Sequence, residues 1–73
     1  MQKLICKKNW YLNGKLGYKV NEEYNVLEKE INNRANCALI ESNKIDFKGW
    51  FWSDSEYFNV DILFIEGRIL NAR

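Results

Sequence analysis

The chain has 73 residues, 47% of them hydrophobic and 15% aromatic, and a formal net charge of +1. It is too apolar for a disordered segment, and no apolar run approaches the roughly 20 residues that a membrane-spanning helix needs. The small net charge provides no bulk attraction to nucleic acid or anionic lipid. We therefore expect one soluble globular domain without membrane contact, which buries only roughly 60% of its unfolded surface.

Short apolar runs between turn residues predict β-strands along the first part of the chain. Strands are expected over residues 4–7 and 9–12. Asn13-Gly14 is the strongest turn signal in the sequence, and it leads into a further short strand over 16–20.

The next segment, residues 22–31, is compatible with two structures. Its glutamates and leucine favour a helix. Tyr24 and Val26 alternate with Asn25, and asparagine is unfavourable inside helices, so the pattern favours a strand. We expect the strand.

The most aromatic stretch lies in an expected strand over residues 45–52, which pairs back against an apolar strand over 37–41. Side chains alternate between the two faces of a strand, so Trp50 and Trp52 point to one face and Phe51 to the other. Both faces therefore carry aromatic bulk.

After this strand, Ser53-x-x-Glu56 matches a capping box and predicts one helical turn over 54–58. Residues 60–65 and 68–70 then predict a C-terminal hairpin. The whole pattern predicts an all-β fold: a small five- to six-stranded antiparallel SH3-like barrel with one short helical turn. Residues 1–73 form its single domain, and 60–73 are a strand or hairpin extension.

Reactive constellations are missing from the sequence. There is no histidine, the glycines are isolated, and Cys6 and Cys37 have no CxxC spacing. We expect no enzyme activity, no cofactor and no metal site. Both cysteines are expected to be reduced and buried as small hydrophobes, with a Cys6–Cys37 disulfide as the alternative.

The aromatic residues exceed what so small a core encloses, which predicts a surface for protein contact. The expected core residues are Trp52, Tyr24, Val26, Leu39 and Phe58. The expected protein-binding residues are large apolar side chains on strand faces: Trp10, Tyr11, Tyr18, Trp50, Leu63 and Ile65. The last two also predict a homodimer that forms through the C-terminal hairpin.

Nucleic-acid binding is the alternative hypothesis. Barrels of this kind bind single strands through exposed rings flanked by lysine. The candidate lysines are Lys7, Lys8, Lys15, Lys19 and Lys48. The competing interpretation is that these lysines occupy solvated faces of edge strands and deter edge-to-edge pairing.

Several short motifs follow one another along the chain. In order they are Cys6-x-Lys8-Asn9-x-Tyr11, two glycine turns, Val20-x-x-x-Tyr24-x-Val26-Leu27, and an aromatic strand end that runs into Ser53-x-x-Glu56-Tyr57-Phe58. Over residues 4–59 this order resembles the small SH3-like barrel proteins encoded by phages and prophages of Gram-positive bacteria. The chain departs from that pattern at Lys7, in a helical turn one residue longer, and in the extension after residue 59. The resemblance implies a non-enzymatic barrel with no assigned ligand.

The coding bias agrees with such an origin, because ten asparagines and eight lysines against three arginines are typical of AT-rich genomes. We therefore expect a binding module that acts in the cytoplasm of a bacterial host by docking on a host protein. Inhibition of a defence system such as a CRISPR nuclease is one instance. A structural or homo-oligomeric phage protein is a further alternative.

Overall fold

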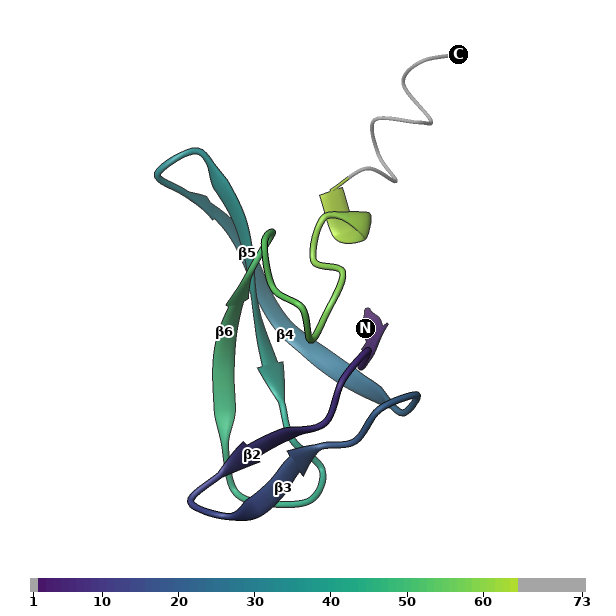
Figure 1. Ribbon diagram of the computed structural model, residues 1–73. Helices are drawn as coiled ribbons and strands as arrows, with labels where there is room; N and C mark the ends of the chain where they lie inside the picture. The colour runs from purple at the N-terminus through teal and green to yellow at the C-terminus, as the bar shows by residue number, and fades with distance from the viewer. Residues whose placement is uncertain (1, 65–73) are drawn as a thin grey trace.

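The computed structural model describes residues 2–64, and over this range the fold is antiparallel β-structure (Figure 1). The all-β prediction is confirmed. One sheet has the strand order β1-β4-β5-β6 and the second pairs β2 with β3, so the ladders of the described residues form two sheets without closing into one barrel. The strands are β1 (Lys3–Ile5), β2 (Trp10–Leu12), β3 (Lys15–Tyr18), β4 (Glu23–Asn32), β5 (Ala35–Glu41) and β6 (Lys48–Trp52).

The longest strand is β4, which confirms the strand prediction for this segment over the helix. It pairs with β1 at one end and with β5 at the other. Its register shifts between Val26 and Glu28, and this bulge changes the face to which the following side chains point. Val26 is buried in the core, whereas Glu28 and Glu30 lie on the opposite, outer face.

Both two-residue hairpin turns use left-handed backbone conformations. Asn13 and Gly14 have φ angles of 51° and 80°, which confirms the turn predicted between β2 and β3. Asn33 and Arg34 connect β4 to β5 with φ angles of 53° and 67°. Paired positive φ angles match the twist of the flanking strands, so each turn fixes the register of its hairpin.

Aromatic rings form the centre of the core, between the two sheets. Tyr18 of β3 lies 5.4 Å from Phe51 of β6 and 5.2 Å from Phe58, measured between ring centroids, and Phe51 and Phe58 are 4.9 Å apart. Tyr18 is fully buried, and its hydroxyl donates a 2.6 Å hydrogen bond to the Ile40 carbonyl. The prediction that Tyr18 lies on a binding surface is therefore wrong. Its polar end finds a backbone acceptor, and this removes most of the cost of burying a phenol.

The corner after β6 returns the chain to β1 without the predicted capping-box helix. Ser55 Oγ, and not Ser53, accepts hydrogen bonds from the amides of Tyr57 (3.0 Å) and Phe58 (3.4 Å). A serine turn of this kind competes with a helical turn for the same amides. Phe58 then forms a β-bridge with Cys6.

Residues 60–64 form a turn and the start of a helical turn, in place of the first predicted C-terminal strand. The amide of Leu63 donates to the Val60 carbonyl at 3.1 Å. Leu63 is buried in the core cluster, so its assignment to a protein-binding surface is also wrong. The side-chain amide of Asn36 donates a 2.8 Å hydrogen bond to the Asp61 carboxylate. Tertiary contacts of this kind outweigh the strand propensity of the β-branched residues. Ile65 and the rest of the proposed hairpin lie outside the described residues.

Both cysteines are buried and free, as predicted, and the alternative disulfide is absent. Within residues 2–64 no helix is long and apolar enough to cross a membrane.

We expect the buried Tyr18 hydroxyl to make folding sensitive to alkaline pH. Burial raises the pKa of Tyr18 from 10.0 to about 12. The unfolded chain therefore loses this proton first, and stability falls as the pH rises from 10 through 12. Replacing Tyr18 by Phe should cost about 1 kcal/mol at pH 7 through the lost hydrogen bond, and should flatten the alkaline decline in urea unfolding. Tyr11→Phe is the matched control and should keep the wild-type slope. Equal slopes in both variants would contradict this.

Candidate protein-binding surface

The outer face of β6 carries the two exposed tryptophans. Trp50 is 37% exposed and Trp52 is 39% exposed, whereas Phe51 between them is 7% exposed and packs in the core. Trp50 is therefore exposed as predicted, but the assignment of Trp52 to the core is wrong. The alternation of side chains along the strand predicts the exposure of Trp52, because it places Trp52 on the same face as Trp50.

The hydrogen-bond register shows how these side chains pack against β5. The Ser42 amide donates to the Phe47 carbonyl at 2.9 Å, and the Ser53 amide donates to the Asn36 carbonyl at 3.0 Å. In an antiparallel ladder bonded and non-bonded pairs alternate, so the pairs Leu39–Trp50 and Cys37–Trp52 are non-bonded. Side chains in non-bonded pairs lie closest together.

Cys37 shows the result of this packing. It is 1% exposed, yet it does not belong to the core cluster that contains its neighbours Ala38 and Ile40. Its thiol donates to the Glu30 carbonyl at 3.3 Å, on the outer side of the sheet. Burial raises the pKa of the Cys37 thiol. We infer that Trp52 covers Cys37, and we use the term tryptophan face for Cys37, Leu39, Trp50 and Trp52.

Charged residues border the tryptophan face on two sides. Glu28 and Glu30 of β4 lie opposite Leu39 and Cys37, and at the other end Glu41 lies opposite Lys48. An apolar centre with a polar border is the arrangement of protein-binding surfaces.

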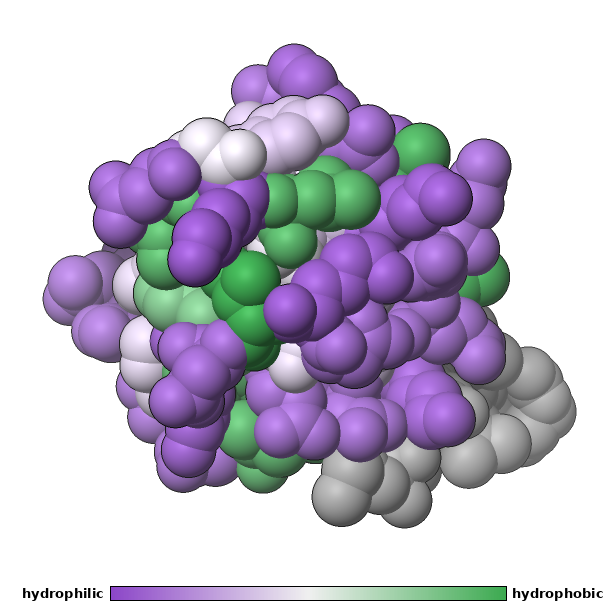
Figure 2. Space-filling model, turned by 90° about the horizontal axis from the view of Figure 1, so that it is seen from below, coloured by the Kyte–Doolittle hydropathy of each residue, from purple (hydrophilic) through white to green (hydrophobic). Residues whose placement is uncertain are grey.

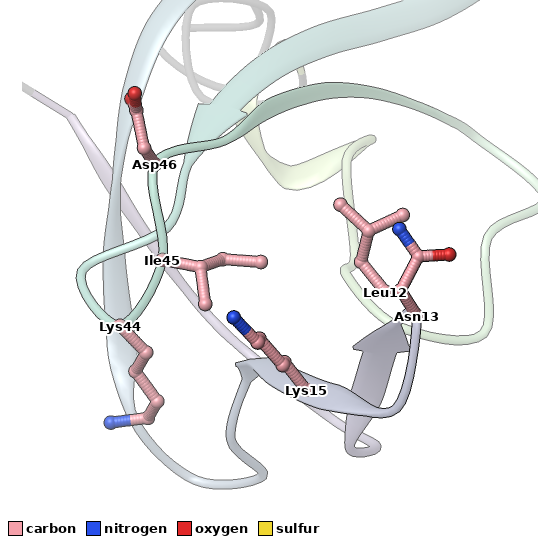
Figure 3. Close-up of a pocket in the computed structure, with 6 residues that line it drawn as sticks. All are labelled: Leu12, Asn13, Lys15, Lys44, Ile45 and Asp46. Carbon is pink, nitrogen blue, oxygen red and sulfur yellow. The ribbon is translucent and has the colours of Figure 1, made fainter.

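A separate open pocket of about 470 Å³ lies where the β2–β3 turn approaches the β5–β6 loop (Figure 3). Figure 3 shows the Lys15 ammonium pointing into the space beside Ile45, with Leu12 on the opposite side. Lys44 forms an ion pair with Glu22 at 2.6 Å, which raises the pKa of Lys44 and lowers that of Glu22. The full lining is Leu12, Asn13, Lys15, Lys44, Ile45 and Asp46.

Ser42 holds this loop in place. Its hydroxyl donates to the Gly17 carbonyl at 2.5 Å and accepts from the amides of Lys44 and Ile45 at 3.0 and 3.1 Å. Seen from this end of the molecule, hydrophobic residues gather near the centre with hydrophilic residues around them (Figure 2). No local sequence pattern indicates this pocket, because its two sides come from turns far apart in the chain.

Trp10 is half-buried and connects the pocket region to β6. Its ring stacks on Phe47 at 5.0 Å and meets the edge of Tyr18 at 5.3 Å. A Cβ atom at Gly17 would lie 2.8 Å from Trp10 Cε3, so the glycine gives the indole its space. Trp10 is therefore largely a packing residue. Tyr11 is 57% exposed, as predicted, and its side chain lies on the face of β2 opposite to that of Trp10.

The predicted nucleic-acid lysines come from several separate segments of the chain. Lys7 and Lys8 follow β1, Lys15 begins β3, Lys19 follows it, and Lys48 begins β6. The Lys8 ammonium forms a 2.9 Å ion pair with the Glu56 carboxylate and lies 5.8 Å from the centre of the Tyr57 ring.

Within the described part of the chain, no group of three or more histidine, cysteine, aspartate or glutamate residues is placed to hold a metal ion. Comparison with protein-family models, with curated proteins and with solved structures found no match to this chain. The candidate surface therefore rests on its geometry.

We expect Trp52→Ala to uncover the Cys37 thiol. Reaction of Cys37 with a thiol reagent such as DTNB should become on the order of tenfold faster, because the rate depends on access to the sulfur. Cys6 lies in the core and should stay slow. Tyr11→Ala is the matched aromatic control. An unchanged rate in Trp52→Ala would show that Trp52 does not cover Cys37.

Proposed function

We propose that this chain is a non-enzymatic binding module that docks on a protein of a bacterial host cell through the tryptophan face. One observation supports this most strongly: Trp50 and Trp52 lie exposed on one face of a sheet, while the rings of Tyr18, Phe51 and Phe58 fill the core. Tryptophan is among the residues most enriched at interface hot spots.

The strand holds these side chains in place before any partner arrives. Phe51 anchors β6 from the core side, and Leu39 and Cys37 support the two indoles from β5. A preformed apolar surface loses little conformational entropy when it is covered, so more of the contact energy contributes to affinity.

The proposal includes the SH3-like barrel fold, a phage or prophage origin and a cytoplasmic site of action. It draws these on the sequence resemblance and on the coding bias. The class of target that fits this setting is a component of a bacterial defence system, such as a CRISPR nuclease, whose surface the module would block.

Binding of single-stranded nucleic acid is the weaker alternative. It needs a continuous basic groove beside the stacking rings. Glu28 and Glu30 border the tryptophan face instead, and Lys8 is paired with Glu56.

We expect the double variant Trp50→Ala/Trp52→Ala to lose its host partner while it remains folded. Truncation of a hot-spot residue costs about 2 kcal/mol or more, which is roughly 30-fold in Kd for each site. The partner is captured from a lysate of a low-GC Gram-positive bacterium on immobilised wild-type chain, and its Kd for each variant is then measured by calorimetry. Tyr11→Ala removes an exposed ring elsewhere and should bind like the wild type.

Two results would contradict the proposal. One is a double variant that binds the purified partner as tightly as the wild type. The other is a chain that captures no protein and shifts single-stranded DNA in a salt-dependent manner, which would favour the nucleic-acid alternative.

A further inference from the structure

The free edge of β6 presents main-chain groups to solvent. β6 lies at the rim of the four-stranded sheet and pairs only with β5 among the described strands (Figure 1). The bonded pairs of this ladder contain Gly49 and Phe51, as the flanking bonds of Phe47 and Ser53 establish. The amides and carbonyls of Lys48, Trp50 and Trp52 therefore point away from β5.

Little in the described residues protects this edge. The Trp52 carbonyl accepts a hydrogen bond from the Ser55 amide at 2.9 Å, but neither main-chain group of Trp50 has a hydrogen-bond partner within residues 2–64. The β5–β6 ladder has no bulge, and the chain has no proline. Bulges and prolines are the usual devices that prevent pairing at an edge, and Lys48 is the one charged residue of β6.

We propose that β6 pairs antiparallel with β6 of a second copy of this chain, about a two-fold axis at Trp50. In this register Trp50 lies opposite Trp50 of the second copy, and Lys48 lies opposite Trp52. All three residues direct their main-chain groups to the free edge, so the Trp50 pair exchanges both of its hydrogen bonds. Each Lys48–Trp52 pair is joined by the Trp52 amide, which donates to the Lys48 carbonyl, because the Trp52 carbonyl is already bonded to the Ser55 amide.

The side chains are complementary in the same register. The two Trp50 indoles become cross-strand neighbours, which is a favourable aromatic pair. Each Lys48 ammonium lies beside a Trp52 ring, where a cation–π contact offsets the deterrent effect of an edge lysine. This self-complementarity selects a second copy as the occupant, because an unrelated peptide would match Lys48 and Trp52 only by coincidence.

Pairing would also enlarge the surface described above. Two four-stranded sheets would join into one, and the tryptophan faces of both copies would lie side by side on it. This goes beyond the proposed host-protein docking and does not depend on it.

Sedimentation equilibrium of the whole chain tests the proposal, with Trp50→Pro and Trp50→Ala as a matched pair. Both variants lose the indole, but only proline removes the edge amide, and it leaves the β5–β6 bonds intact. The wild type should approach twice the 8.8 kDa chain mass with rising concentration. Trp50→Ala should dimerise more weakly, and Trp50→Pro at least tenfold more weakly again.

Cysteine cross-linking tests the register independently of proline's effect on folding. In Trp50→Cys the two new thiols face each other across the axis at a Cα separation near 5.5 Å, which permits a disulfide. In Lys48→Cys they are roughly 13 Å apart, so only Trp50→Cys should give a covalent dimer on mild oxidation. The native thiols are buried.

Three results would overturn the proposal: a wild-type mass of 8.8 kDa at every concentration up to the millimolar range, equal dimerisation of the alanine and proline variants, or equal cross-linking of the two cysteine variants. A monomer that still binds a host protein through its tryptophans would overturn this proposal alone. An edge that is filled instead by an extended segment of a host protein would appear as a one-to-one complex with a monomeric chain.

Discussion

The packing of Phe51 between Tyr18 and Phe58 is the constraint on which the surface of this molecule depends. Because side chains alternate along β6, a buried Phe51 places Trp50 and Trp52 on the outer face. A shift of one residue would bring both indoles into the core and expel the phenylalanine. Tyr18 completes the arrangement from the second sheet, where its hydroxyl bonds to the Ile40 carbonyl of β5. The core thus determines which aromatic residues a partner can reach.

A serine hydrogen bond and a close contact between a glycine and a tryptophan ring hold the two sheets together. Ser42 binds the Gly17 carbonyl of β3 and two amides of its own loop, and Gly17 leaves the space that Trp10 fills. The hairpin of β2 and β3 is therefore fixed against the base of β6. One side of the pocket, formed by Lys44, Ile45 and Asp46, and the two tryptophans of the tryptophan face therefore lie on one continuous stretch of chain, from residue 44 to residue 52.

Local patterns predicted the fold class, the Asn13-Gly14 turn and the strand character of β4, because turn chemistry and alternation are properties of neighbouring residues. They did not predict that Tyr18 finds a buried acceptor, or that Asp61 is held by Asn36, because those partners are distant in the sequence. For the candidate site, Trp50 was expected on the surface but Trp52 was assigned to the core. A count of the rings that a small core holds cannot say which ring is left outside.

Amide hydrogen exchange, measured by NMR on dilute chain, tests the register of β6, because it reports the direction of each main-chain group in that strand. We expect slow exchange for Gly49 and Phe51, whose amides bond to β5, and fast exchange for Trp50, whose amide faces the free edge. Protection of Trp50 should appear only as the concentration rises. Protection of Trp50 in the dilute monomer, with fast exchange at Gly49 and Phe51, would contradict the register and the surface derived from it.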